Sequence, residues 1–214
     1  MFEINTKLSE LIGIIIGDGN VYYNPQLRKY FFEITGDPKL ENEYFEHISN
    51  LVQDIIHKKP SIRIGGRGLR LRLYSKEFIE FLIHRLNFPY GKKSEIITIP
   101  KKINNWNILK YCIRGITDTD GSLFFSKKGN NLFYPSIEIS TNSKFLAFQI
   151  KNILKNKYRI CLRKFSKKGI NNKYVVSVNG NIMVKRWVEE IGFSNKRKLE
   201  KWERWDLDPQ HLEF

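Results

Sequence analysis

The chain has 214 residues, of which 41% are hydrophobic, so it can build a packed core as one large domain or two small ones, and this excludes a disordered chain. Its 37 lysine and arginine residues outnumber 22 aspartate and glutamate residues, and the net charge of +15 indicates a polyanionic partner such as nucleic acid. Two cysteines without C-x-x-C spacing and the lack of a membrane-length apolar run exclude a disulfide framework and a membrane span, and predict an intracellular location, in the cytoplasm or nucleoid or in an organelle.

The predicted elements run in the same order twice along the chain. Periodicity and turn residues divide the first part into a helix ending near 18, strands 20–23 and 30–35, a helix 40–57, strands 61–64 and 69–75, and a helix 76–87. The second part has a helix ending at 120, strands 122–126 and 134–141, a helix 144–157, strands 159–165 and 174–179, and helices 181–191 and 195–205. We therefore predict an α+β fold of two pseudo-symmetric αββαββα repeats, residues 1–88 and 106–214, joined by a linker, 89–105.

The first helices of the two repeats carry a shared motif. Residues 11–19 read L-I-G-I-I-I-G-D-G and residues 113–121 read I-R-G-I-T-D-T-D-G, so Asp18 and Asp120 occupy the same place. Further along, residues 32–35 (F-E-I-T) match residues 137–140 (I-E-I-S), after an insertion that we place in a hairpin loop at 126–131. The two copies therefore also match at positions outside the shared motif, and this supports a true duplication.

Small residues at four-residue spacing predict that these two helices cross closely. They are Gly13 and Gly17 in the first helix and Gly115 and Thr119 in the second. Residues of this size on one face let two backbones approach, as small-xxx-small pairs do in membranes. We therefore expect a central two-helix interface that brings the ends of both helices together.

Close crossing would place the carboxylates of Asp18 and Asp120 side by side, each at the negative end of a helix dipole. A divalent cation would relieve this repulsion, and a shell of carboxylate, phosphate and water oxygens suits Mg²⁺. Asp118 lacks a counterpart, because Ile16 stands at its place in the first copy. The competing interpretation is that both aspartates are ordinary turn residues ahead of a glycine.

Basic residues alternate with apolar ones along the outer strands of each repeat. In residues 69–73 (L-R-L-R-L) the leucines face one side and the arginines the other, which predicts a polar sheet face able to enter the DNA major groove. The alternative is an ordinary solvated face. The predicted DNA-binding residues are Arg63, Arg70, Arg72, Arg159, Arg163, Ser177 and Asn179.

Two lysines hold matched positions after the helix that closes each repeat. Lys93 and Lys198 each lie five residues after a phenylalanine, Phe88 and Phe193. We predict that both lysines act beside the scissile phosphates, where they would polarise water or stabilise developing charge. Their competing interpretation is a plain surface cation.

The two motifs resemble those of LAGLIDADG homing endonucleases in their single-chain form, and the resemblance covers nearly the whole chain. It implies a monomer with two saddle-shaped antiparallel sheets that cleaves a long, asymmetric double-stranded DNA site with Mg²⁺, for which Mn²⁺ can substitute. It also implies metal ligation by Asp18 and Asp120 and by the backbone carbonyls of Gly17 and Thr119. Some members place a polar residue at the end of the second strand of each repeat, where this chain has Gly36 and Thr141.

Two other functions are compatible with this resemblance. An intron RNA maturase would use the same fold to bind RNA, although it could dispense with the two aspartates that this chain retains. A transcription regulator of this fold would usually carry a helix-turn-helix domain, for which we expect no spare length here. Both alternatives share the basic surface, and neither requires a membrane.

Overall fold

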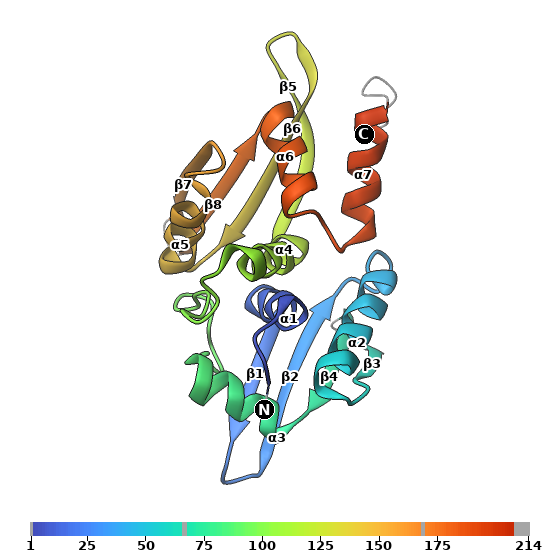
Figure 1. The fold of residues 1–214 in the computed structure, drawn as a ribbon, viewed down its shortest axis with the longest axis vertical. Coiled ribbons are helices and arrows are strands. Elements are labelled where there is room, and N and C mark those ends of the chain that lie inside the picture. The colour runs from blue at the N-terminus through green and yellow to red at the C-terminus, as the bar shows by residue number, and fades with distance from the viewer. Residues whose placement is uncertain (1, 66–67, 168–169, 208–214) are drawn as a thin grey trace.

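The structure, a computed structural model, describes residues 2–65, 68–167 and 170–207, and it contains two four-stranded antiparallel sheets (Figure 1). The first sheet has the order β1-β2-β4-β3 and comprises β1 (Gly19–Asn24), β2 (Lys29–Gly36), β3 (Ser61–Gly65) and β4 (Gly68–Tyr74). The second has the equivalent order β5-β6-β8-β7 and comprises β5 (Gly121–Lys128), β6 (Asn131–Thr141), β7 (Ile160–Lys167) and β8 (Ile170–Asn179). The repeated order confirms the predicted α+β fold with two pseudo-symmetric halves.

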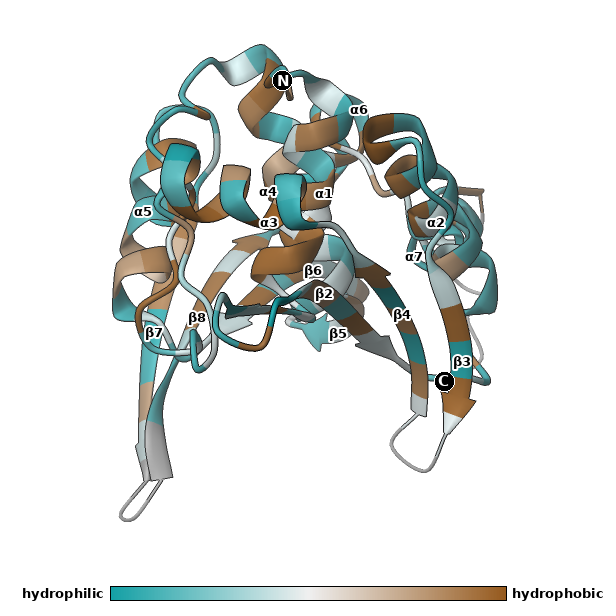
Figure 2. Cartoon of the chain, turned by 90° about the horizontal axis from the view of Figure 1, so that it is seen from below, coloured by the Kyte–Doolittle hydropathy of each residue, from teal (hydrophilic) through white to brown (hydrophobic). Residues whose placement is uncertain are grey.

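The helices lie on one side of both sheets. At the centre, α1 (Thr6–Ile16) lies beside α4 (Trp106–Asp120), with α2 (Asn42–Ile56) and α3 (Lys76–Glu80) in the first half and α5 (Lys144–Leu154), α6 (Asn181–Glu190) and α7 (Lys196–Leu207) in the second (Figure 1). Figure 2 shows the sheets curving beneath these helices as an arch, and no described helix covers their lower face. We call this lower face of the two sheets the open face.

The central helices start at asparagine caps and end where the first strand of each sheet begins. The side chain of Asn5 accepts a hydrogen bond from the backbone of Leu8 (3.0 Å), and Asn105 accepts one from Asn107 (2.9 Å). At the other end, α1 is followed by β1 after two residues, and α4 runs directly into β5 at Gly121. This connection fixes both acidic helix ends at the junction between helix and sheet.

The close crossing of α1 and α4 is confirmed by the space around their glycines. A Cβ atom on Gly13 would lie 2.1 Å from the carbonyl oxygen of Cys112, and one on Gly115 would lie 2.4 Å from that of Glu10. Atoms do not approach this closely, so each glycine faces the backbone of the opposite helix. The small residues therefore set the separation of the two helices.

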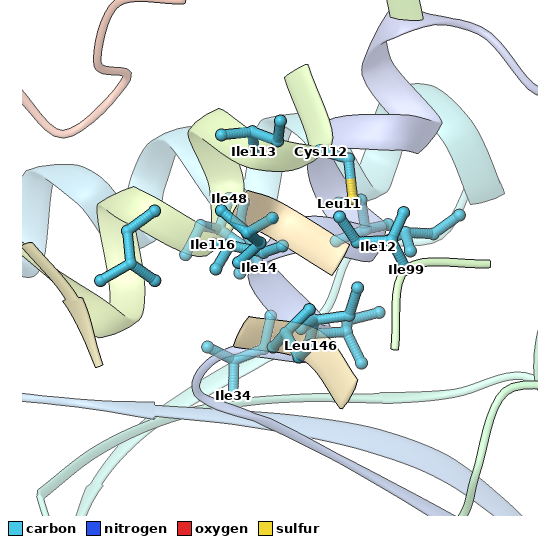
Figure 3. Close-up of a cluster of buried hydrophobic side chains, with 14 of the residues drawn as sticks. Leu11, Ile12, Ile14, Ile34, Ile48, Ile99, Cys112, Ile113, Ile116 and Leu146 are labelled. Carbon is cyan, nitrogen blue, oxygen red and sulfur yellow. The ribbon is translucent and has the colours of Figure 1, made fainter. Parts of the chain in front are cut away.

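A single hydrophobic core spans the seam between the halves (Figure 3). Leu11 of α1 and Ile116 of α4 are fully buried there together with Ile48 from α2 and Leu146 from α5. The stretch 89–105 joins this core through Ile99, whose backbone N–H and C=O are both hydrogen-bonded by the Gln149 side chain (2.8 and 2.9 Å). The predicted linker thus packs at the seam, and the boundaries 1–88 and 106–214 stay predictions.

Three local features differ from the sequence-based expectation. The hairpin loop predicted at 126–131 is shorter, because β5 and β6 extend to Lys128 and from Asn131, and a register shift near Ser126 takes up part of the insertion. The helix predicted over 76–87 becomes a π-helical turn, η1 (Phe81–Arg85), after α3. Helix ends shift too, with α2 starting at Asn42 and α5 ending at Leu154, as is common for frayed termini.

None of the described helices has the length and apolar character needed to cross a membrane.

Candidate active site and nucleic-acid interface

The structure brings Asp18 and Asp120 together at the ends of the two central helices. Asp120 is the last residue of α4, and its carboxyl carbon lies 3.5 Å from the place that a Cβ atom on Gly17 would take, directly beside Asp18. The Asp18 backbone is held by the sheet, since its carbonyl accepts a hydrogen bond from Thr35 of β2 (3.3 Å). The duplicated motif therefore delivers its two carboxylates to one place.

The protonation of both carboxylates reflects a buried, like-charged pair. Burial raises the pKa of Asp18 to about 6, and the neighbouring charge of Asp120 adds to the increase. Burial also raises the pKa of Asp120, while the ammonium groups of Lys93 and Lys198 oppose the increase. Two acids in this position favour a bound cation, because a cation would stabilise the ionised form of each.

Lys93 and Lys198 cap the carboxyl ends of the two motif helices. The ammonium of Lys93 donates to the carbonyl oxygens of Ile16 and Gly17, the latter at 2.9 Å. The ammonium of Lys198 donates to the carbonyls of Thr117 (2.5 Å) and Asp118 (2.8 Å). Both lysines thus place positive charge at the negative end of a helix dipole and beside the aspartates.

The pKa of each lysine reports the same environment. Burial lowers the pKa of Lys93 to about 8, although the nearby Asp120 and Asp18 raise it. Burial also lowers the pKa of Lys198, against the charge of Asp118 above all. Gly17 and Thr119 were predicted to bind metal through their backbone carbonyls. The Gly17 carbonyl accepts a hydrogen bond from the ammonium of Lys93. The hydroxyl of Thr119 donates a hydrogen bond to the carbonyl of Gly115 (2.8 Å).

A cavity of about 520 Å³ opens at this place and combines residues from both halves of the chain. Gly17 lines it from the first repeat, Lys93 from the stretch 89–105, and Asp120, Thr141 and Lys173 from the second repeat. Thr141 ends β6, the position at which a polar residue near the site was expected. The cavity therefore pairs the acid that ends α4 with the lysine that follows the first repeat.

Asp118, which has no counterpart in the first repeat and was not predicted to bind metal, lies in the core below the site. It is 1% exposed, and burial raises its pKa to about 7. One carboxylate oxygen accepts a hydrogen bond from the backbone of Ser194 (2.8 Å), while the other is buried without a partner among the described residues. Asp118 thus faces the segment that precedes α7 and not the cavity.

Glu41 is a site residue that sequence reasoning missed. It lies just before α2, its carboxylate would lie 2.5 Å from a Cβ atom on Gly36, and it accepts a hydrogen bond from Asp37 N–H (2.7 Å). Its charge raises the pKa of both Asp18 and Lys198. The missing side chain of Gly36 leaves the room for this carboxylate, and that glycine was the only sequence signal for it.

The open face of the first sheet carries the predicted arginines. Leu69, Leu71 and Leu73 point into the core, so the alternation along β4 is confirmed. Arg72 is held by Glu33 through its Nε (2.7 Å) and lies over the ring of Phe31 at 4.6 Å. Arg70 is also paired with Glu33 (3.9 Å), and Arg63 stands opposite Arg70 on the edge strand.

The second sheet presents a different set of polar side chains. Arg163 on β7 is paired with Glu138 on β6, and Arg159 and Asn179 line a cavity of about 410 Å³ at the strand ends. Ser177 is only 2% exposed, and its hydroxyl accepts a hydrogen bond from the amide of Asn179 (3.3 Å). The burial of Ser177 therefore leaves little of its side chain open to the DNA contact predicted for it.

The donor set fits a hard divalent cation. Among residues 2–65, 68–167 and 170–207 no group of three or more histidine, cysteine, aspartate or glutamate side chains is placed to hold a metal ion. A cation here would take two carboxylates from the protein and its other ligands from backbone, water or phosphate oxygens, as Mg²⁺ commonly does. The buried repulsion between Asp18 and Asp120 is the feature that such an ion would relieve.

Comparison with curated proteins gives matches to segments of much longer chains. The chain is 30% identical over 207 residues to the replication factor C small subunit of Methanocaldococcus jannaschii, which covers 93% of this chain and 10% of that protein. It is 26% identical over 203 residues to the corresponding subunit of Thermococcus kodakarensis, with 91% and 20% covered. The chain thus spans a tenth and a fifth of these relatives. No family model matches it.

Comparison with solved structures identifies the fold. Variants of the homing endonuclease I-DmoI superpose with a TM-score of 0.62 at 19% identity, covering 87% of this chain and 95% of that one. The homing endonuclease I-WcaI, bound to its DNA recognition sequence, gives 0.59 at 16% identity (93% and 88% covered). The N-terminal LAGLIDADG domain of DUF199/WhiA gives 0.58 at 16% identity (93% and 86%). With both motif helices in one polypeptide, the chain has the single-chain, two-motif LAGLIDADG fold.

Proposed function

We propose that this chain is a site-specific homing endonuclease that makes a double-strand break in a long, asymmetric DNA site. The observation that carries the proposal is the meeting of the Asp18 and Asp120 carboxylates at the seam between the halves. The net charge of +15 and the arginines on the open face support DNA as the partner. Two structural neighbours are homing endonucleases solved in complex with DNA.

In this proposal Asp18 and Asp120, with the carbonyls of Gly17 and Thr119, hold Mg²⁺, for which Mn²⁺ can substitute. Structures of I-DmoI were obtained with Ca, Mg and Mn, which supports a divalent cation. Bound there, the ion would supply Lewis-acid stabilisation of the attacking and leaving oxygens. The two carboxylates would hold that ion between the halves, where its positive charge would offset their repulsion of a phosphate.

The lysines complete the proposed chemistry from the protein side. The ammonium groups of Lys93 and Lys198 lie beside the carboxylates, where they stabilise negative charge that develops on a phosphate during hydrolysis. Burial of both lysines strengthens this effect, because charges interact more strongly away from water. Since one polypeptide carries both halves, we expect the chain to act as a monomer.

The similarity to replication factor C small subunits does not favour a clamp-loader activity. The match covers 10% and 20% of those proteins, so most of each lies outside the region that resembles this chain. The matched segments instead extend over nearly all of this chain, which has the LAGLIDADG fold. An intron RNA maturase remains the alternative, and cleavage of DNA separates it from a nuclease.

The test uses Asp18→Asn and Asp120→Asn. We expect either variant to lose cleavage by at least about a hundredfold while it retains DNA binding, because each carboxylate serves hydrolysis more than docking. Duplexes selected by binding from a randomised library are incubated with wild type and variants in Mg²⁺ and in EDTA, and binding is followed by gel shift.

Asp54→Asn is the matched control. Asp54 is an exposed aspartate paired with Lys7 (2.6 Å) at the start of α1, the opposite end of that helix from Asp18, so its variant should cut like wild type. Full cleavage by Asp18→Asn or Asp120→Asn rejects the proposed site. A wild-type chain that binds RNA introns and cuts no duplex supports the maturase instead.

A further inference from the structure

The open face carries two carboxylates at matching positions, which is unexpected for a surface proposed to bind DNA. Glu33 lies on β2 between Asn20 of β1 and Arg72 of β4. Glu138 lies on β6 between Ser122 of β5 and Ser177 of β8. Both positions are the same place in two sheets of equivalent strand order, and a carboxylate there repels the phosphate backbone.

Each carboxylate holds arginine side chains of the same face. Glu33 is paired with Arg72 through two nitrogen atoms of the guanidinium and with Arg70 at 3.9 Å. Glu138 is paired with Arg163. The side chains of Glu33 and Glu138 are only 15% and 22% exposed, so the arginines cover them.

Two of these arginines, Arg72 and Arg163, are fixed on a second side by aromatic rings. Arg72 lies over Phe31 at 4.6 Å, and Phe31 is stacked on Tyr22 (4.9 Å) and in contact with Tyr74 (5.2 Å). Arg163 lies over Phe165 at 5.6 Å. A carboxylate and a ring thus restrict the guanidinium groups of Arg72 and Arg163 before any DNA is bound, which lowers the entropy lost on binding.

The partners of the two carboxylates come from different strands. Arg70 and Arg72 belong to β4, which pairs directly with the strand of Glu33. In the second sheet, Val175 and Ser177 occupy those places, and Arg163 reaches Glu138 from the edge strand β7. Two equal carboxylates therefore present differently placed arginines, as an asymmetric DNA site requires.

Folding stability is a weak explanation for these pairs. Their arginines are 32%, 36% and 46% exposed, and ion pairs this exposed contribute little to stability. A held guanidinium, by contrast, can present its fork to the O6 and N7 atoms of a guanine, and this is the commonest specific protein–DNA contact.

We propose that Glu33 and Glu138 are specificity-determining residues, each of which holds arginines in position to read bases in one half of the DNA site and repels phosphate when the bases do not match. This inference rests on the proposed function, because it requires DNA on the open face. It assigns a role to two acids that neither catalyse nor bind metal.

The test selects duplexes from a randomised library with wild type, Glu33→Gln and Glu138→Gln, and compares the selected motifs. Glutamine keeps the size of glutamate and removes its charge, so the arginines are released. We expect Glu33→Gln to lose sequence preference in one half-site and Glu138→Gln in the other. The ratio of specific to non-specific affinity should fall about tenfold, within the range for one bidentate base contact.

Two further variants sharpen the comparison. Glu80→Gln removes an equal charge from α3, where Glu80 pairs with Lys76, and should leave the motif unchanged. Glu33→Asp keeps the negative charge but moves it away from the guanidinium of Arg72. The ratio of specific to non-specific affinity of this variant should lie between those of wild type and Glu33→Gln. Melting temperatures equal to wild type are expected for all variants, and the two glutamate positions test the idea independently.

The outcomes separate this inference from the proposed function. If both glutamine variants select the wild-type motif with an unchanged ratio of specific to non-specific affinity, the role of the carboxylates is overturned. The proposed function is then left intact. A wild-type chain that selects no sequence overturns both. Loss of preference spread equally over both half-sites by each variant also contradicts the proposal, because each carboxylate contacts arginines of one sheet only.

Discussion

At the scale of single residues, the site is organised by compensation between buried charges. Two carboxylates meet at the seam, and two lysines bind the carbonyl ends of the same helices. The lysines differ by one residue in the carbonyls they reach, since Lys93 binds at Ile16 and Gly17, and Lys198 binds at Thr117 and Asp118. The two halves are therefore similar without being identical.

Lys93→Met tests the role proposed for the lysines. It removes the ammonium beside Asp120 and Asp18, and we expect cleavage to fall by about a hundredfold, as for the loss of one preorganised charge donor. DNA binding should change much less, because Lys93 is only partly exposed. Single-turnover cleavage measures the first effect and gel shift the second.

The exposed neighbour Lys92 supplies the control. Lys92→Met removes the same charge from the rim of the same cavity and should keep near wild-type cleavage. Equal loss in both variants would mean that general basicity matters and that the position of Lys93 does not.

At the scale of elements, the contact between α1 and α4 decides whether the site forms. Gly13 and Gly115 face the opposite backbone, and the Glu10 side chain crosses from α1 to Arg114 of α4 (3.8 Å) and to His47 of α2 (2.9 Å). Packing and charge thus fasten the same two helices that end in Asp18 and Asp120. Changes in this contact should alter stability and cleavage together.

Gly13→Ala should force the two helices apart. The added methyl would lie 2.1 Å from the Cys112 carbonyl, so we expect a loss of about 3 kcal/mol in the free energy of unfolding. Urea denaturation measures it. In Gly65→Ala the methyl meets no atom of the described residues within 4 Å, so this control should change stability by well under 1 kcal/mol. A stable Gly13→Ala variant would contradict the close crossing.

Glu10 predicts a pH dependence of stability. Burial by itself raises the pKa of Glu10, but hydrogen bonds from His47 and Ser194 and the charge of Arg114 outweigh it, so the pKa lies below its ordinary value of 4.5. A lowered pKa stabilises the folded state above the unfolded value and loses this contribution as pH falls through the folded one.

We therefore expect Glu10→Gln to cost about 2 kcal/mol at pH 7 and progressively less below about pH 4.5. Urea denaturation from pH 7 to pH 3 measures the difference between variant and wild type. A difference that does not shrink at low pH would show that packing, and not the charge of Glu10, accounts for the loss.

At the scale of the whole molecule, helices occupy one side of the arch and the two sheets occupy the other (Figure 2). The excess of 15 positive charges predicts that DNA affinity falls steeply with salt, because bound counterions are released from the duplex. Arg63 is exposed on the edge strand β3, and no carboxylate in the described part of the chain is paired with it. Such an arginine is available to a phosphate.

Arg63→Ala should therefore reduce the slope of log affinity against log salt by about 0.9, the value for one phosphate contact, with little change in sequence preference. Arg72→Ala, which removes an arginine held by Glu33, should instead weaken recognition by about 1–3 kcal/mol and relax the preferred sequence. Fluorescence anisotropy at several salt concentrations distinguishes the two. Identical behaviour of both variants would mean that the open face does not divide these tasks.

The sequence by itself determined the duplicated order of elements, the two motif helices and the alternation that separates core from open face. These features depend on local periodicity and on a register that one chain carries twice, so they can be identified without coordinates. The places of Asp18, Asp120, Lys93 and Lys198 followed from the same register. Their roles in hydrolysis stay predictions.

Only the tertiary structure decided the other contacts around the site and on the open face. It placed Glu41 beside Gly36, bound Arg72 to Glu33, buried Ser177 and packed the 89–105 stretch through Ile99. These features depend on which residues strand register and helix packing bring close together. Strand register and helix packing are not encoded in a local sequence pattern. The hydrophobic period specifies which face of an element is buried, whereas the partner across that face is set by the fold as a whole.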